Sequence, residues 1–170
     1  MTSLSQATME SPVGVLRLVA TDTALVAVLW PEERDGRVRF ATTPTVLTSA
    51  ATKKHTALAQ TANQLDEYFR GVRHTFDVPL DLRGTDFQQQ VWRSLANIAF
   101  GETSTYGKQA AAIGRPRAVR AVGAANGRNP LSIVLPCHRI VGASGKLTGF
   151  AGGIDTKRWL LDHEAKLIAD

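Results

Sequence analysis

Residues 131–140 read Leu-Ser-Ile-Val-Leu-Pro-Cys-His-Arg-Ile, and they contain Cys137, the only cysteine of the chain. A short apolar run that ends at a proline predicts a buried strand ending in a turn, because proline has no N–H to continue a ladder. His138 places a group that titrates near neutral pH beside the thiol, and Arg139 adds a positive charge that favours the thiolate. The pattern therefore predicts a reactive thiol at the end of a rigid element.

The alternative is that the thiol only fills space, because a single cysteine in a globular protein is usually a small buried apolar residue. Four features near Cys137 favour the reactive thiol instead. They are the preceding proline, the cation at Arg139, the glycine-rich stretch 142–153 and the pair Asn129-Pro130.

A capping box predicts a helix upstream of this stretch. Thr85 is suited to the N-cap and Gln88 to the third helical position. Apolar residues recur on one face as far as about Ile98, so we expect a packed amphipathic helix with a purely structural role.

Two shorter helices are predicted next. Ser104 can cap a helix over 105–113 that Gly114 ends, and Pro116 suits the first turn of a helix that reaches about Ala125. Two short helices joined by a few residues are typical of a helix-turn-helix.

The second of these helices has an unusual outer face. On a helical wheel Val119 and Val122 lie together and should face the core, with Arg120 and Ala124 opposite and Ala121 on the flank. A helix that reads the major groove presents long polar side chains, whereas small residues allow the close approach that suits a minor groove. A helix made small for tight packing remains the alternative.

The first half of the chain predicts a small α/β unit without chemistry. Two β-type runs at 13–19 and 25–30 predict a hairpin, and 42–52 is expected to form a loop. A helix over 58–69 and a strand over 76–82 complete the unit.

The composition narrows the functional classes. One cysteine cannot form an internal disulfide or a multi-cysteine zinc site. No apolar run approaches the ~18 residues that span a membrane, and the first ten residues do not resemble a signal peptide. We therefore expect a cytoplasmic protein that does not contact membranes.

The net charge of +5 falls entirely in the second half, which has eleven basic and six acidic residues over 85–170. No acidic residue lies between Glu102 and Asp155. This stretch predicts a positive surface suited to a phosphate backbone, although charge alone leaves a merely solvated face as an alternative. Its basic residues are Lys108, Arg115, Arg117, Arg120, Arg128, Arg139 and Lys146.

From about Phe87 to Glu164 the sequence resembles the O6-alkylguanine-DNA alkyltransferases, also called methylated-DNA-protein-cysteine methyltransferases. The resemblance implies an α/β N-terminal subdomain over 1–82, with a small sheet and a helix. A mostly helical domain over 83–170 follows, with a helix-turn-helix and a short strand that leads to the cysteine. The matching residues are Tyr106, Arg120-Ala121-Val122-Gly123, Asn129-Pro130, Pro136-Cys137-His138-Arg139, Ser144-Gly145, Gly152-Gly153 and Trp159-Leu160-Leu161 with Glu164.

The resemblance implies direct reversal of DNA damage. The alkyl group on O6 of guanine, and on O4 of thymine, passes irreversibly to Cys137 in a single turnover, after the base has rotated out through the minor groove. Base rotation answers a geometric need, because a stacked base hides the alkylated oxygen. The implied partner is double-stranded DNA carrying O6-alkylguanine, with no cofactor, no metal and no obligate protein partner.

The resemblance also assigns roles. His138, oriented by Glu164, takes the proton of Cys137 through a water, Tyr106 offers a proton to the leaving guanine, and Asn129 holds the turn. Sequence alone would make Glu164 a solvated residue of a helix over 155–167, capped by Asp155 and packed through Trp159, Leu160 and His163 or Leu167. The implied base pocket comprises Tyr106, Ile140, Gly142, Ser144, Phe150 and Ala151. The implied DNA contacts are Ala118, Arg120, Ala121, Gly123 and Arg128, with Arg120 filling the vacated stack.

Two departures and two rivals remain. Phe150 and Ala151 stand where some family members have Tyr and Ser, so acceptance of bulky adducts such as benzyl is open. The first half has no cysteine cluster for a metal-dependent phosphotriester repair module. One rival is a sensor of alkylated DNA without chemistry, although such alkyltransferase-like proteins lack the cysteine. The other is a cysteine hydrolase, which needs an oxyanion hole and turnover.

Overall fold

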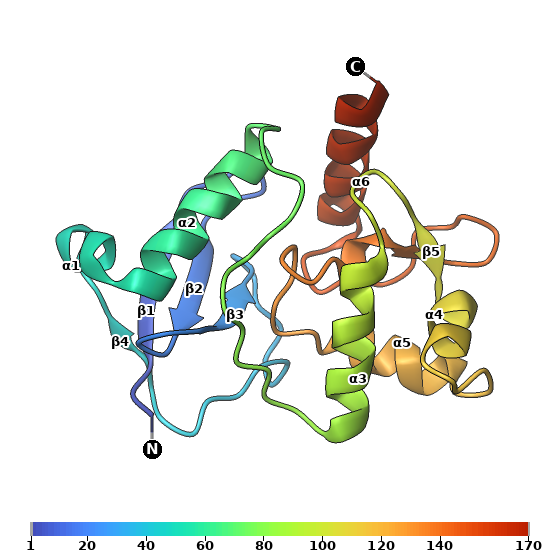
Figure 1. Cartoon of the computed structure of the whole chain (residues 1–170), viewed down its shortest axis with the longest axis horizontal. Helices are drawn as coiled ribbons and strands as arrows, with labels where there is room; N and C mark the ends of the chain where they lie inside the picture. Colours follow the sequence, from blue (N-terminus) through green and yellow to red (C-terminus); the bar gives the residue numbers. More distant parts are fainter. Residues whose placement is uncertain (1, 170) are drawn as a thin grey trace. The chain divides into compact units, whose positions relative to one another are not determined.

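The computed structural model describes residues 2–169, and the chain divides into two compact units, Met1–Leu82 and Arg83–Asp170. The first unit holds a small sheet with helices, and the second is mostly helical, which confirms the predicted fold class (Figure 1). Within the described residues, no helix combines the length and the apolar character needed to cross a bilayer.

The sheet of the first unit has the strand order β3-β2-β1-β4. The predicted hairpin is confirmed, because β2 and β3 pair antiparallel with Arg17 opposite Leu29. The sequence Leu-Val-Ala-Val-Leu makes β3 apolar throughout, and it is buried along its whole length. The strands are β1 (Ser5–Met9), β2 (Leu16–Ala20), β3 (Leu25–Leu29) and β4 (Thr45–Val46).

Two helices accompany this sheet, α1 (Ser49–Lys54) and α2 (Thr56–Phe69). The predicted helix is confirmed as α2, which buries Leu58, Leu65 and Tyr68. The expectation of a loop over 42–52 is wrong, because β4 and the start of α1 lie there. The side chain of Thr48 caps α1 by accepting from the N–H of Ala51. This cap is a local helix signal, but the many Thr, Ser and Pro residues of the segment favoured the prediction of a loop.

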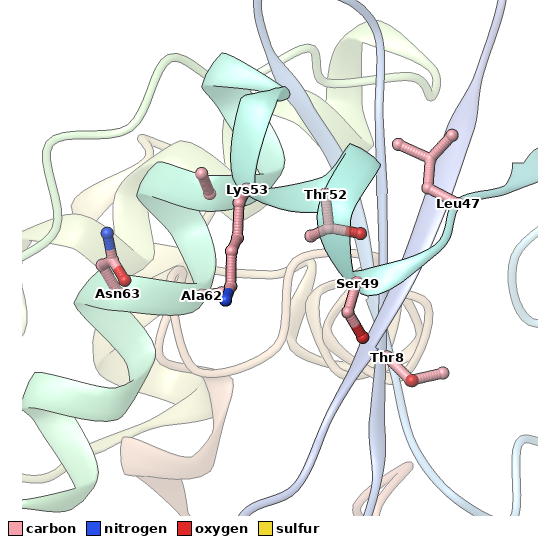
Figure 2. Close-up of a pocket in the computed structure, with 8 residues that line it drawn as sticks. Thr8, Leu47, Ser49, Thr52, Lys53, Ala62 and Asn63 are labelled. Carbon is pink, nitrogen blue, oxygen red and sulfur yellow. The ribbon is translucent and has the colours of Figure 1, made fainter.

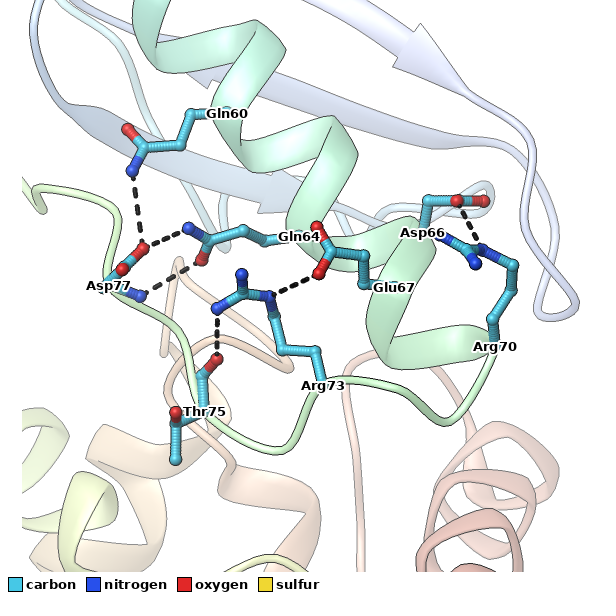
Figure 3. A network of polar contacts seen from close by, with 8 residues as sticks. All are labelled: Gln60, Gln64, Asp66, Glu67, Arg70, Arg73, Thr75 and Asp77. Atoms are coloured by element: carbon cyan, nitrogen blue, oxygen red, sulfur yellow. Dashed lines mark hydrogen bonds and ion pairs between the residues drawn. The ribbon is translucent and has the colours of Figure 1, made fainter.

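The predicted strand over 76–82 is also wrong, since only an isolated bridge joins Leu80 to Leu25. A side chain of α2 takes one backbone group that a strand would need, because the N–H of Asp77 donates to Gln64 Oε1 at 3.1 Å. Just before this segment, Arg73 Nη1 donates to the carbonyl of Thr75 at 3.0 Å. Figure 3 shows these contacts along α2.

The first unit also contains a pocket of about 360 Å³ (Figure 2). Its walls carry hydroxyl groups, one amide and one lysine. The lining residues are Thr8, Leu47, Ser49, Thr52, Lys53, Ala59, Ala62 and Asn63.

The second unit begins with helix α3 (Asp86–Ser94), whose predicted capping box is confirmed. Thr85 Oγ1 accepts from the N–H of Gln88 at 3.1 Å, and Gln88 Oε1 accepts from the N–H of Thr85 at 3.0 Å. The helix ends earlier than predicted, because a 3-10 turn, Leu95–Asn97, replaces its last part.

The predicted pair of short helices is present as α4 (Tyr106–Ala112) and α5 (Val119–Gly127). A buried amide pair joins them, with Asn126 Nδ2 donating to Gln109 Oε1 at 2.6 Å. Trp92 Nε1 donates to the carbonyl of Ala125 at 2.7 Å and ties α3 to α5. The two helices are therefore fixed to a common core.

Three details of this motif were predicted wrongly. Thr105, not Ser104, caps α4, and Ser104 lies in a short strand instead. Pro116 lies before α5, which begins only at Val119. Val122 is buried as expected, but Val119 is 39% exposed because it stands at the open first turn.

The predicted strand over 131–135 is wrong. These residues are buried, but they form turns, with Ile133 at a φ of 73°. Asn129 takes the groups that a strand partner would use, since its Nδ2 donates to the carbonyl of Leu135 and its Oδ1 accepts from the N–H of Leu131. The short strand near Cys137 follows the cysteine, as β6 (Ile140–Val141), which pairs parallel with β5 (Ser104–Thr105).

The last helix of the described residues is α6 (Ile154–Ala169), which starts one residue before Asp155. Asp155 therefore lies in the first turn rather than at the cap. The buried face comprises Lys157, Leu160 and Glu164. Of the face predicted from the sequence, only Leu160 is buried, while the rings of Trp159 and His163 stack at 4.8 Å.

Candidate active site

Cys137 begins a 3-10 turn, Cys137–Arg139, and is 7% exposed. The preceding residues anchor this turn, because the N–H of Cys137 donates to the carbonyl of Leu135 at 2.8 Å. Asn129 donates to the same carbonyl at 2.8 Å from its fully buried side chain. The position of the sulfur is thus set by hydrogen bonds within the turn.

His138 is completely buried, with its Nε2 2.6 Å from Glu164 Oε2. Burial lowers the pKa of His138, and although the neighbouring Glu164 opposes the shift, the net pKa lies below the usual value. The imidazole is therefore neutral at pH 7, with Nε2–H donating to the carboxylate. Its Nδ1 is buried and has no hydrogen-bond partner among the residues described, so a lone pair is available to accept a proton.

Glu164 accepts hydrogen bonds from parts of the unit that are far apart in sequence. Arg139 donates from Nε at 2.8 Å and from Nη2 at 3.2 Å, and the N–H of Gly101 donates at 3.1 Å. Burial alone would raise the pKa of Glu164, but the hydrogen bonds and charges of His138 and Arg139 outweigh it and hold the pKa well below its usual range. The carboxylate is therefore charged.

Arg139 has a different role from the one that its sequence position suggests. Its charge was expected to favour the thiolate, but its guanidinium is paired with Glu164. Its Nη1 also donates to the carbonyl of Ile98 at 2.6 Å, and its Cζ lies 5.7 Å from the ring centroid of Phe100. Arg139 thus fixes the carboxylate and the segment after α3 together.

Lys157 is a site residue that sequence reasoning missed. It is 1% exposed, and its Nζ lies 3.4 Å from the carbonyl of Thr148 and 6.0 Å from the ring centroid of Phe150. Burial lowers the pKa of Lys157, whereas a thiolate at Cys137 would raise it, because the ammonium lies near the sulfur. Its position in the sequence could have indicated this, because residues seven positions apart lie on the same face of a helix, and Lys157 precedes Glu164 by seven residues.

The residues expected to form the base pocket lie in different environments. Tyr106 is half-buried, and its hydroxyl lies 2.6 Å from Thr148 Oγ1. Phe150 and Ala151 are half-buried before α6, and Ile140 is fully buried in β6. Gly142 donates its N–H to the carbonyl of Lys146 at 2.8 Å, while Ser144 is exposed at the tip of that turn.

The residues expected to contact DNA lie on and beside α5. Arg120 and Ala121 are exposed in its first turn, and Arg128 is exposed just after its last residue. Ala118, at the N-cap, and Gly123 are half-buried. A Cβ at Gly123 would lie 3.7 Å from the Tyr106 ring, an ordinary contact distance, so the ring lies beside α5.

His138 allows a prediction about acid stability. Because its pKa is lower in the folded chain, the unfolded chain binds the proton more readily, so stability is fully present above about pH 6.5 and falls as the pH decreases. We expect the free energy of unfolding by urea to fall by up to about 1.4 kcal/mol per pH unit below pH 6.5. His138→Asn should remove this slope, and the exposed His74→Asn should retain it. A wild-type stability that is constant from pH 7 to 5 would contradict the assignment.

A buried thiol beside a neutral imidazole and a charged carboxylate defines a cysteine-dependent protein, and two family models identify which one. The 6-O-methylguanine DNA methyltransferase ribonuclease-like domain matches residues 4–82, and the DNA binding domain of the same family matches residues 86–166. The chain belongs to the 6-O-methylguanine DNA methyltransferase family.

Relatives and solved structures agree with this assignment. A methylated-DNA–protein-cysteine methyltransferase of Mycobacterium tuberculosis is 47% identical over 157 residues, which cover 92% of this chain and 90% of the relative. A protein of the same name from Methanosarcina barkeri is 53% identical over 105 residues, which cover 62% of this chain and 66% of the relative.

The crystal structure of the M. tuberculosis O6-methylguanine methyltransferase superposes with a TM-score of 0.84 at 45% identity, covering 96% of this chain and 93% of that one. A structure of M. tuberculosis OGT in complex with DNA gives a TM-score of 0.81 at 44% identity, covering 96% of this chain and 94% of that one.

Proposed function

We propose that the protein repairs DNA by direct reversal, with Cys137 taking the alkyl group from O6 of guanine once and irreversibly. The observation that carries this proposal is the state of His138. Its imidazole is neutral, donates from Nε2 to Glu164, and keeps a buried Nδ1 without a partner among the described residues. A base in this state, next in sequence to the thiol, suits removal of the thiol proton through one bridging water.

The reaction is an in-line displacement at a saturated carbon. The sulfur lone pair forms the new C–S bond, the electrons of the C–O6 bond stay with guanine, and guanine gains a proton at N3 from Tyr106. The proton that left Cys137 is returned to solvent and finally restores Tyr106, so charge and protons balance. The product is a thioether, which ordinary thiol reductants do not cleave, and each molecule therefore acts once.

The partner is double-stranded DNA that carries O6-alkylguanine, with O4-alkylthymine as a second substrate. The alkylated oxygen is hidden in the stack, so the base must rotate out to meet the sulfur. Small residues of α5 suit entry into the minor groove, and Arg120 is placed in its exposed first turn, where it can fill the vacated stack. A thiol that must stay reduced suits a reducing compartment such as the cytoplasm.

Replacing Arg120 by alanine tests the role of α5. We expect Arg120→Ala to slow transfer from duplex DNA by about tenfold, because the extruded base loses the side chain that holds its place in the stack. Transfer from the free base O6-methylguanine should change by less than about twofold, since no stack is involved. Arg93→Ala, at an exposed arginine of α3, is the control. Equal losses on the two substrates would reject the stack-filling role.

The decisive test of the whole proposal is the mass of the intact protein after incubation with duplex DNA carrying one O6-methylguanine. We expect a stoichiometric gain of one methyl group, located on Cys137 by peptide mapping. Binding without any gain in mass would indicate a sensor, and product in excess of protein would indicate a hydrolase. Either result would overturn the proposal.

A further inference from the structure

A hydrogen bond links Tyr106 to a residue that has been given no role. Tyr106 is the first residue of α4, and Thr148 lies in the segment between β6 and α6. The phenol oxygen and Thr148 Oγ1 are 2.6 Å apart in a partly buried position. This short contact joins the proposed proton donor to the segment that also carries Phe150.

The backbone of Thr148 is anchored to α6, and its side chain lies close to the turn that begins at Gly142. Its carbonyl lies 3.4 Å from Nζ of the buried Lys157. Its methyl group lies 3.6 Å from the position that a Cβ on Gly142 would take, so the turn that begins at Gly142 passes close to it. The backbone of Thr148 is thus tied to α6, and its hydroxyl meets Tyr106 from a half-buried position.

The direction of the hydrogen bond follows from the number of protons available. A phenol has one O–H, and so has a threonine side chain. If Tyr106 gives its O–H to guanine N3, it cannot also give it to Thr148. In the reacting complex the phenol oxygen must therefore accept from Thr148, whose hydroxyl then stabilises the negative charge that develops on Tyr106 as its proton leaves.

We propose that Thr148 is a positioning residue for alkyl transfer, donating a hydrogen bond to Tyr106 that aims the phenol O–H at the leaving guanine. This inference rests on the proposed function and on Tyr106 as the proton donor. Thr148 loses no proton and forms no covalent bond. It sets the orientation of the phenol and compensates the charge of the phenolate until solvent restores the proton.

A matched pair of variants separates the hydroxyl of Thr148 from its shape. Thr148→Val keeps the volume and removes the hydroxyl, whereas Thr148→Ser keeps the hydroxyl. We expect single-turnover methyl transfer to be about fivefold slower in Thr148→Val, the cost of one lost hydrogen bond in the transition state, and nearly unchanged in Thr148→Ser. Affinity for the methylated duplex and the melting temperature should match the wild type in both variants.

A double-mutant cycle with Tyr106→Phe distinguishes a role through the phenol from a general effect on the structure, because it measures whether the two substitutions slow methyl transfer independently. In the Tyr106→Phe background, Thr148→Val should cause no further slowing, because the phenol oxygen is already absent. Equal slowing in both backgrounds, or wild-type rates in Thr148→Val, would overturn the inference. Should Thr148→Val fold poorly, Thr148→Ala in the same cycle gives the same comparison.

The two proposals fail in different ways. A wild-type protein that gains no methyl group refutes the proposed function and, with it, the role of Thr148. A wild-type protein that gains one methyl while the cycle shows no coupling between Tyr106 and Thr148 refutes the role of Thr148 alone.

Discussion

The protein with Cys137 replaced by serine is expected to gain no methyl group from O6-methylguanine DNA, while it still binds that DNA. A serine hydroxyl is far less acidic than a thiol, so a neutral imidazole leaves it protonated, and its oxygen is a poor nucleophile toward a saturated carbon. We expect transfer to fall by at least about a thousandfold, as when the nucleophile of other covalent enzymes is removed. Intact-mass measurement after long incubation provides the test.

The same variant should leave the DNA affinity within about twofold of the wild type, because Cys137 lies outside α5, the helix that we expect to contact the DNA. Binding is measured by fluorescence anisotropy with a methylated duplex at fixed salt. Loss of binding together with loss of transfer would contradict the separation of the thiol from the DNA contacts.

Replacing Glu164 by glutamine is expected to have the largest effect on stability. The change removes the carboxylate that Arg139 and His138 face in a buried site. Breaking such a buried pair by removing one partner costs about 3–5 kcal/mol, because the other charge is left uncompensated. Transfer should also slow strongly, since Nε2–H of His138 loses its charged acceptor and the imidazolium that forms during proton transfer is no longer stabilised.

The free energy of unfolding by urea at pH 7, together with single-turnover kinetics, measures both effects. Asp155→Asn, in the first turn of the same helix, is the control, because its ion pair with Arg158 is exposed and should contribute little. In the wild type, the lowered pKa of Glu164 means that its contribution is present above about pH 4.5 and lost as the pH falls below it. A Glu164→Gln protein as stable as Asp155→Asn would refute the buried ion pair.

Features with local signals could be predicted from the sequence. The capping box of Thr85 and Gln88 located the start of α3, because both hydrogen bonds form between residues three positions apart. The apolar run of β3 likewise identified a buried strand. The polar strand β1, Ser-Gln-Ala-Thr-Met, was missed because its partners on both sides, and not its own residues, make it a strand.

The site required contacts between distant residues. The apolar run 131–135 has the composition of a strand, but side-chain hydrogen bonds from Asn129 compete with strand pairing and fold it into turns. Glu164 alone would be a solvated helix residue, since nothing in its own helix shows that Arg139 and His138 meet it. The same holds for Thr148, whose partner Tyr106 lies 42 residues away.

Glu164 completes the site from α6, 26 residues after His138 in the sequence. The carboxylate meets the imidazole only through the tertiary fold, because the two residues lie in different elements. In an unfolded chain the imidazole next to Cys137 therefore lacks its charged partner, and the sulfur becomes fully competent only when α6 has packed against the turn. A protein that can react only once is thereby kept from reacting before it has folded.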